Sequence, residues 1–307
     1  MNASLVLWRL LIALVTLLIA SLIVFFSLNL IPGDPALSLL GVGATPGAVA
    51  ALREQLGLNE PPLGRYLGWL TGALRGDLGT SIRYSQPVTG LLGTRLPFTL
   101  TLALLSLGLT ALLALGLGIL AARREGSWLD LTLRAVLTLL SAVPAFWLGL
   151  LLILVFAVKY RLLASTGFRG ARDLILPMLT LVLVRVSLST RMVRAALLET
   201  MRSDHVRTAR AKGLPERQVL LRHGLRNALI PLLTVLGLEF AELLTGTVIV
   251  ENVFALPGMG TLALQAISAR DFPLVQGAVL VLALFVVTVN LLVDLAYGLV
   301  DPRVRYG

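Results

Sequence analysis

The chain alternates long apolar stretches with shorter polar connections. Six of the apolar stretches are long enough to cross a bilayer of about 30 Å at a rise of about 1.5 Å per residue. They cover residues 10–31, 98–122, 135–158, 174–190, 228–250 and 277–300. The pattern predicts an all-α integral membrane protein with six transmembrane helices.

The composition agrees with this fold class. Hydrophobic residues make up 57% of the chain and charged residues 14%, where a soluble domain carries about 25% charged residues. The chain has no cysteine, which excludes a disulfide framework, a thiolate metal site and a cysteine nucleophile. The net charge of +10 would suggest binding to nucleic acid in a soluble protein. In a membrane protein, an excess of Lys and Arg instead indicates the orientation of the spans. We therefore expect no nucleic-acid partner and no metal site.

The basic residues predict the orientation of the spans. The first apolar stretch has 22 residues, more than the roughly 7–15 of the apolar h-region of a signal peptide, so we interpret it as a retained anchor. An even number of spans places both termini on one side. That side carries 15 Lys and Arg residues against five in the short opposite connections, which predicts cytoplasmic termini by the positive-inside rule. The four basic residues of the third connection, Lys159, Arg161, Arg169 and Arg172, oppose this orientation.

Residues 32–97 form an external connection too long for a simple link. Thr45 can cap a helix that starts at Pro46 and ends at Gly57, because proline suits the first helical position and glycine the end. A second short helix is expected from Pro62 to about Gly72. Two interpretations stay open, namely a folded lid of surface helices and a contact surface for an external partner protein.

The fourth connection, residues 191–227, carries nine basic side chains, two histidines and three acids. Asp204 can cap a helix that runs from His205 through Lys212, and Gly213 would end it. A second amphipathic helix is expected over residues 216–227. Such a helix-turn-helix on the cytoplasmic face would form a docking surface, and the alternative is a basic patch that holds anionic lipid.

Short motifs along the whole chain carry a resemblance to a known family. They are Arg207-Thr208-Ala209-Arg210-Ala211-Lys212-Gly213, Arg226-Asn227-Ala228-Leu229-Ile230-Pro231, Pro32-Gly33-Asp34-Pro35, Gly76-Asp77-Leu78-Gly79-Thr80-Ser81, Glu251-Asn252-Val253-Phe254, Pro257-Gly258-Met259-Gly260, Arg270-Asp271-Phe272-Pro273 and Asp301-Pro302-Arg303. Together they resemble the binding-protein-dependent ABC importer permeases, specifically the first-permease type of the dipeptide, oligopeptide and nickel branch. Arg207 stands where the wider importer signature has glutamate, which is similar to the peptide branch.

The resemblance implies a type I importer architecture and a division of labour. It implies an inner-membrane location in bacteria, a related second permease, an external substrate-binding protein, and two cytoplasmic ATPases that hold ATP and Mg²⁺. The sequence has no Gly-x-x-x-x-Gly-Lys-Ser/Thr loop, so we expect no ATP hydrolysis and no cofactor in this chain. By carry-over, the coupling residues would be Asp204, His205, Arg207, Thr208, Ala209, Arg210, Ala211, Lys212 and Gly213. The chain is expected to divide into three parts. These are the N-terminus with the first span, residues 1–31, the external loop, residues 32–97, and the permease core, residues 98–307.

Ionisable side chains within the predicted spans are few. A charge at the bilayer centre costs about 2.5–3.5 kcal/mol on insertion scales, so each should face protein or water. Glu239 and Glu242 share one helical face, and Asn290 shares another with Asp294. These groups and Arg185 could line a translocation path, or Arg185 could pair with one of the acids and join two spans. We assign Arg185, Glu239, Glu242 and Asn290 to the path and Asp294 to structure.

Two prolines, Pro144 and Pro177, lie inside or at the start of predicted spans. Proline removes a backbone donor and clashes with the preceding turn. We therefore expect a kink at each position, and the alternative at either one is a local packing irregularity.

Other function classes fit the sequence less well. His205 and His223 both fall in the fourth connection, and no His-Glu-x-x-His motif occurs, which disfavours a membrane enzyme. A stand-alone secondary carrier or channel would use intramembrane acids as ion sites, but no internal repeat is evident. Short peptides are the cargo that the resemblance implies. A nickel or metal-chelate cargo stays open, as does the choice between a hetero- and a homodimer of permeases.

Overall fold

The computed structural model describes residues 3–29, 35–40, 43–55, 57, 59–215 and 218–300. The regular secondary structure of this part is helical apart from one isolated β-bridge between Thr80 and Pro87. The chain falls into two compact units. One comprises Met1–Val6, Thr99–Pro257 and Val289–Gly307, and the other Leu7–Phe98 and Gly258–Thr288.

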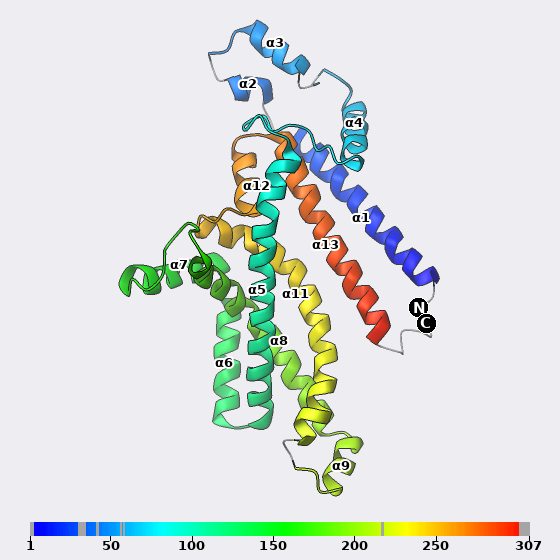
Figure 1. Ribbon diagram of the computed structural model, residues 1–307, viewed down its shortest axis with the longest axis vertical. Helices are drawn as coiled ribbons and strands as arrows, with labels where there is room; N and C mark the ends of the chain where they lie inside the picture. The colour runs from blue at the N-terminus through cyan, green and yellow to red at the C-terminus, as the bar shows by residue number, and fades with distance from the viewer. Residues whose placement is uncertain are drawn as a thin grey trace. The chain divides into compact units, whose positions relative to one another are not determined.

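Long helices account for most of the described chain. They are α1 (Ala3–Asn29), α5 (Val88–Arg123), α8 (Ile175–Met201), α11 (Leu225–Val253) and α13 (Phe272–Val300), as Figure 1 shows. By length and composition, four of the described helices can cross a membrane, or five if the bent pair described below is one span. The prediction of an all-helical membrane protein is confirmed at this level.

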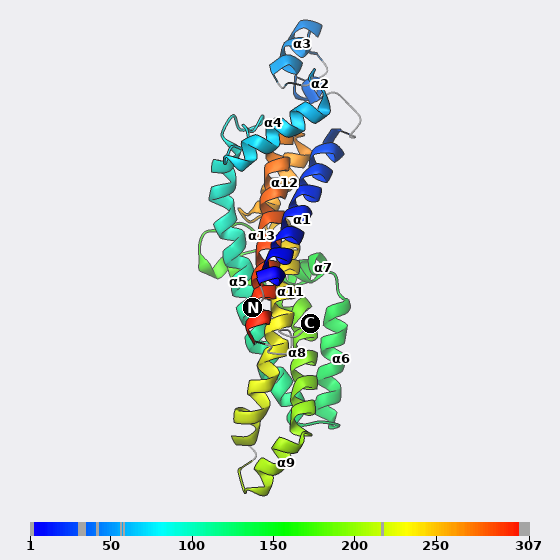
Figure 2. The ribbon, with the colours of Figure 1, turned by 90° about the vertical axis from the view of Figure 1, so that its right-hand side faces the viewer.

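The α8 helix forms the centre of the larger unit. It packs against α11 and against α6 (Trp128–Ala142), which runs beside it in Figure 2. Val182 and Val186 of α8 are buried with Leu137 of α6. A Cβ atom at Gly118 of α5 would lie 2.6 Å from Cγ1 of Val193, so a glycine is needed where these two helices meet.

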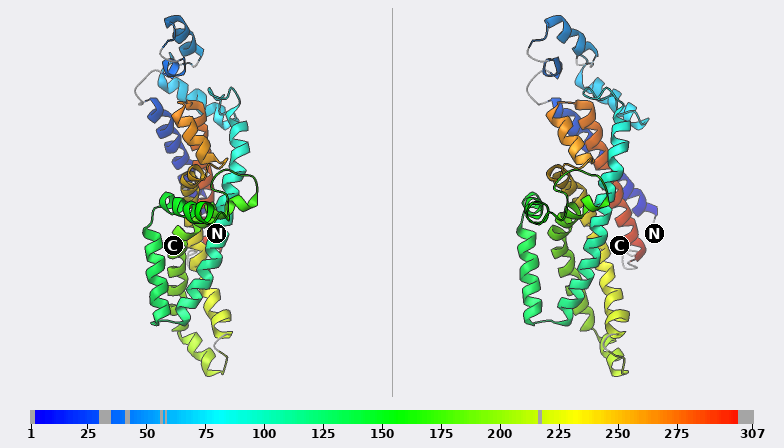
Figure 3. Two further views of the ribbon diagram at one scale, coloured as in Figure 1. Left: turned by 90° about the vertical axis from the view of Figure 1, so that its left-hand side faces the viewer. Right: turned by 60° about the vertical axis from the view of Figure 1, so that its left-hand side comes forward.

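The third predicted span is broken rather than kinked. The helix α6 and the segment of α7 (Ala145–Leu152) with the π-helical η1 (Ile153–Lys159) make an angle of 105°, and Figure 3 shows α7 running across the direction of α6. Val143, which precedes Pro144, has an extended backbone with ψ of 128°, as proline requires of its predecessor. The interruption of the helix at this point follows from this restriction.

The prediction of a kink at Pro177 was wrong. Pro177 is the third residue of α8, in the turn whose N–H groups have no intrahelical acceptor. The missing donor therefore costs no hydrogen bond. The short helix η2 (Ala171–Leu174) leads directly into α8.

The smaller unit contains the short helices of the long connection, α2 (Pro35–Leu40), α3 (Pro46–Gln55) and α4 (Pro62–Leu74), and also α12 (Met259–Ser268). The predicted helices at Pro46 and Pro62 are confirmed, and the hydroxyl of Thr45 accepts a hydrogen bond from the Ala48 amide at 3.4 Å. The helix α2 was not predicted.

Helix α4 is held against α1 by aromatic side chains. The hydroxyl groups of Tyr66 and Ser21 are 2.9 Å apart and both residues are buried. The Tyr66 ring meets Phe25 edge-on at a centroid distance of 5.4 Å, a geometry that stabilises aromatic pairs. The short helix is therefore docked on a long apolar one.

Candidate functional site

The short helix α9 (Asp204–Ala211) lies within the basic fourth connection. Its N-cap is Ser203, with φ of −75° and ψ of 154°, so the predicted N-cap at Asp204 was wrong by one residue. The Ser203 carbonyl oxygen accepts a hydrogen bond from the Arg207 amide at 3.1 Å. Asp204 instead occupies the first turn, where a carboxylate is favoured by the helix dipole.

The end of α9 has the geometry of a Schellman motif. The Gly213 amide donates to the Arg210 carbonyl at 2.9 Å, and the Leu214 amide donates to the Ala209 carbonyl at 3.4 Å. Gly213 has φ of +76°, a left-handed conformation that glycine adopts without steric cost. The prediction that Gly213 ends the helix is confirmed.

One side of α9 is packed and the other is open. Val206 and Ala209 are buried with Val219 and contact Met201 at the end of α8. The remaining candidate coupling residues that the structure describes are exposed, namely Asp204, Arg207, Thr208, Arg210, Ala211, Lys212 and Gly213. The side chain of His205 lies outside the described residues. The helix thus combines an anchored apolar face with a polar face open to a partner.

The predicted second amphipathic helix is not a separate element. The π-helical segment η3 (Val219–Gly224) runs directly into α11 at Leu225. Gly224 has helical angles, φ of −67° and ψ of −57°, so nothing ends the helix there. Residues 216–217 lie outside the described part. The packing of α9 on η3 therefore joins it to the start of a long helix.

The charged side chains of α8 and α11 that were predicted to lie within spans occupy a buried and an exposed position. Arg185 of α8 pairs with Glu242 of α11, and their side chains are 27% and 60% exposed. Glu239 is buried, and one of its carboxylate oxygens accepts a hydrogen bond from Ser189 at 2.8 Å. Asn290 is exposed on α13. The predicted pairing of Arg185 with an acid is confirmed, whereas the side chain of Asp294 lies outside the described residues.

A buried ion pair that was not predicted joins α6 to α8. Both oxygens of Asp130 accept from the Arg194 guanidinium, at 2.8 and 2.7 Å. The Asp130 side chain is fully buried and also accepts from the Gly126 amide at 3.2 Å. The capping pattern from Ser127 to Asp130 is visible in the sequence, but the partner 64 residues away is not.

A second unpredicted contact closes a loop in the smaller unit. The buried carboxylate of Asp271 accepts hydrogen bonds from the Ser81 hydroxyl and from the Ile82 and Arg83 amides, the last two at 3.2 Å. Ser81 and Asp271 belong to two of the motifs noted above. The contact gives the acid and the hydroxyl at these positions a structural role.

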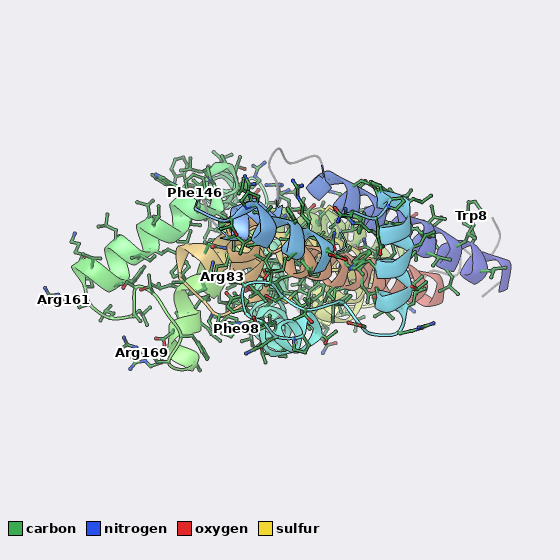
Figure 4. All side chains as sticks on the ribbon, turned by 90° about the horizontal axis from the view of Figure 1, so that it is seen from above. Trp8, Arg83, Phe98, Phe146, Arg161 and Arg169 are labelled. Carbon is green, nitrogen blue, oxygen red and sulfur yellow. The ribbon has the colours of Figure 1, made fainter. Side chains whose placement is uncertain are left out.

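Two basic residues of the third connection have side chains that point away from the helices. Arg161 and Arg169 lie between η1 and η2, and their side chains point outward in Figure 4. The loop is held by its backbone instead, because the Asp173 carboxylate accepts from the Arg169 amide at 2.7 Å and the Gly167 amide donates to the Phe254 carbonyl at 2.8 Å.

Family comparisons cover nearly the whole chain. The family described as "Binding-protein-dependent transport system inner membrane component" matches residues 114–306, and its N-terminal counterpart, "Binding-prot-dependent transport system membrane comp, N-term", matches residues 3–103. The chain belongs to this family. It is accordingly the membrane subunit, or permease, of an ABC importer, and a multi-pass protein of the inner membrane.

Named relatives match this permease from end to end. It is 41% identical to a Brucella melitensis protein named as a peptide transport system permease, with 100% of each chain covered. It is 38% identical to the glutathione transport system permease GsiC of Salmonella choleraesuis, with 98% of each chain covered.

Solved structures support the fold. The permease aligns with a chain of the MetNI methionine ABC transporter, solved in inward-facing conformations, with a TM-score of 0.56 and 22% identity over 69% of this chain and 96% of that one. A chain of an amino acid ABC transporter gives the same TM-score at 18% identity, over 68% of this chain and 94% of that one. This likeness supports the helical fold of the permease.

Proposed function

We propose that this permease forms half of a translocation channel that imports short peptides, driven by ATP. A related second permease would supply the other half, two cytoplasmic ATPases the energy, and an external binding protein the cargo. The names of the relatives, which include peptide and glutathione transport, support a peptide cargo. The ATP and Mg²⁺ would be held by the ATPases, since this chain has no phosphate-binding loop.

The observation that carries the proposal is the geometry of α9. An element that transmits force must be fixed to the moving helices, and Val206 and Ala209 fix α9 to the segment η3 that continues as α11. Its other side must reach a partner, and Arg207 and Lys212 are exposed there. We assign α9 as the coupling helix, seated in a groove of the ATPase so that nucleotide-driven closure moves the spans.

The topology follows from the same proposal. We assign six spans with both termini in the cytoplasm, which requires α11 and the bent pair of α6 and α7 each to count as one span. The predicted orientation puts α9 and the end of α5 on the cytoplasmic side, beside the ATPases. The segment 32–97 would then lie outside, where its short helices can act as a lid or as a contact for the binding protein.

The pair of Arg185 and Glu242 supports a path on one face of α8 and α11. Both residues lie near the middle of their helices, where a charge that faces lipid costs about 2.5–3.5 kcal/mol. Glu242 is 60% exposed, so this face is suited to water or to the second permease rather than to lipid. A zwitterionic peptide offers charges of both signs to such a pair. We place Asn290 in the path as well. Glu239 is buried, and we assign it to the support of the path.

The test is transport by the reconstituted complex. We expect peptide uptake into proteoliposomes only with all subunits, the binding protein and ATP. Uptake by this chain alone under an ion gradient would overturn the proposal in favour of a secondary carrier. Nickel or a metal chelate in place of the peptide gives the cargo control, and ATP-driven uptake of the metal without the peptide would correct the cargo.

A further inference from the structure

Four polar side chains of α8 and α11 form one cluster inside the larger unit. Arg185 and Ser189 lie about one turn apart on α8, and Glu239 and Glu242 lie about one turn apart on α11. Arg185 pairs with Glu242, and the Ser189 hydroxyl donates to Oε2 of Glu239 at 2.8 Å. Each of the two turns of α8 therefore contacts one acid of α11. We call these four residues the polar cluster.

The charges of the polar cluster do not balance. It holds two carboxylates and one guanidinium, which gives a formal charge of −1. The Arg185 guanidinium is paired with Glu242 and also interacts electrostatically with Glu239, so one cation serves two acids. A bound ammonium group would bring the formal charge to zero, whereas a bound carboxylate would bring it to −2. The cluster therefore favours the cationic end of a zwitterionic ligand.

The two acids differ in their accessibility. The side chain of Glu242 is 60% exposed and that of Arg185 is 27% exposed, whereas Glu239 is buried. A ligand that approaches the exposed side of the cluster can reach the Glu242 carboxylate directly. It cannot reach Glu239, because that carboxylate is covered by the protein. Glu242 is therefore the group that a ligand ammonium would contact.

Glu239 offers Arg185 a second acceptor. Its oxygen Oε1 is buried and accepts no hydrogen bond from the residues that the structure describes, and a buried acceptor without a donor is unfavourable. The two acids are about 4.5 Å apart along the helix axis, three residues at a rise of about 1.5 Å each. A rotation of the long Arg185 side chain covers this separation. Arg185 can thus leave Glu242 for Glu239 without a movement of the backbone.

From this geometry we propose that Glu242 binds the N-terminal ammonium group of the cargo peptide while Arg185 moves to Glu239. The proposal rests on the proposed import of peptides and specifies which end of the peptide the path recognises. Each charge keeps a partner of opposite sign, since the ammonium replaces the guanidinium at Glu242 and the guanidinium gains Glu239. A peptide whose N-terminus carries no charge cannot displace Arg185 in this way.

The experiment measures peptide binding to the complete transporter in nanodiscs by saturation-transfer NMR. Hydrolysis-deficient ATPases hold ATP, and the binding protein is omitted so that only the path binds the peptide. The probes are trialanine, N-acetyl-trialanine and trialanine amide. We expect acetylation to raise the dissociation constant about tenfold, the lower end for hydrogen bonds to charged groups, and amidation of the C-terminus to leave it unchanged.

Two variants assign this preference to one carboxylate. Glu242→Gln should bind trialanine and N-acetyl-trialanine with equal affinity, because the neutral amide offers no charge to the ammonium. Glu199→Gln is the matched control, since Glu199 is exposed on the same helix α8 but lies outside the polar cluster. It should keep the tenfold preference. Loss of the preference in the control as well would overturn the assignment to Glu242.

A third variant tests the second acceptor. Glu239→Gln keeps an acceptor for the Ser189 hydroxyl but removes the charge to which Arg185 would move. We expect it to raise the dissociation constant of trialanine and to leave that of N-acetyl-trialanine unchanged. An equal loss of affinity for all three peptides would show that Glu239 only supports the fold, and it would overturn the movement of Arg185.

The remaining outcomes separate this inference from the proposed function. Equal affinity of the wild-type transporter for trialanine and its N-acetyl form, or no binding of any of the three peptides, would overturn the ammonium site. A preference for the free C-terminal carboxylate would assign recognition to Arg185 and would overturn it too. ATP-driven uptake by the complete system with the binding protein is measured in parallel. Its absence would contradict the proposed function, whereas uptake that does not depend on Glu242 would contradict only this inference.

Discussion

Replacing Gly213 by valine tests whether the fixed geometry of α9 couples ATP hydrolysis to transport. No heavy atom lies within 4 Å of a Cβ atom built at Gly213, so the substitution causes no clash. The cost comes from the backbone, because φ of +76° disfavours a residue with a side chain by about 1–2 kcal/mol. A β-branched residue is expected near the upper end of this range.

That free energy is large for so short a helix. It corresponds to a shift of about 5–30-fold in the equilibrium between the seated and the displaced α9. The two hydrogen bonds that close the helix, from the Gly213 and Leu214 amides, are lost if the turn changes conformation. Gly213→Val therefore should lower the number of peptides taken up per ATP hydrolysed, while the ATPases continue to hydrolyse ATP.

The assay measures uptake and ATP hydrolysis in the same proteoliposomes. Gly213→Asn is the matched variant, since asparagine tolerates the left-handed region and should retain most of the coupling. Full coupling in the valine variant would refute the reasoning. An equal loss in the asparagine variant would show that glycine is needed for a reason other than its φ angle.

Three further substitutions test contacts elsewhere in the permease. Asp130→Asn breaks the buried pair with Arg194, whose side chain is 18% exposed. We expect the free energy of unfolding to fall by about 3 kcal/mol, at the low end for buried pairs because Arg194 is partly exposed. An unchanged thermal midpoint of the purified complex would contradict this. Gly277→Ala places a Cβ atom 2.6 Å from Cγ1 of Val88 and should cost about 1–3 kcal/mol of stability. Adding Val88→Ala should restore the thermal midpoint, and no restoration would exclude the clash. Asp271→Asn should speed hydrogen exchange of the Ile82 and Arg83 amides, which donate to the Asp271 carboxylate. Unchanged exchange would show that this carboxylate does not hold the loop.

Features set by neighbouring residues were predictable from the sequence. The helices that start at Pro46 and Pro62 follow from proline at the first helical position, and the end of α9 follows from Gly213. The helix that contains the fourth predicted span is longer than the span itself. The helix α8 continues to Met201, because its last turns are polar on the surface but buried on the side of Val193 and Leu197.

Features set by distant residues were not predictable. The size of the bend at Pro144 depends on what packs against α7, and proline alone predicts only a kink. Asp130 and Arg194 are separated by 64 residues, and no local pattern indicates their contact. The pairing of Arg185 was predicted because an intramembrane charge needs a partner, but the choice of Glu242 over Glu239 depends on how α8 and α11 are rotated.

The central claim, that α9 transmits motion from an ATPase, is tested most directly by crosslinking during turnover. The chain has no cysteine, so Ala211→Cys introduces a unique reactive group on the exposed side of α9. We expect a short bifunctional reagent to join it to the ATPase subunit, with a yield that changes between the nucleotide-free and the ATP-bound transporter. Ser165→Cys, exposed in the third connection, should give no such product. Failure of position 211 to crosslink to the ATPase in any nucleotide state, in a transporter that remains active, would contradict the account.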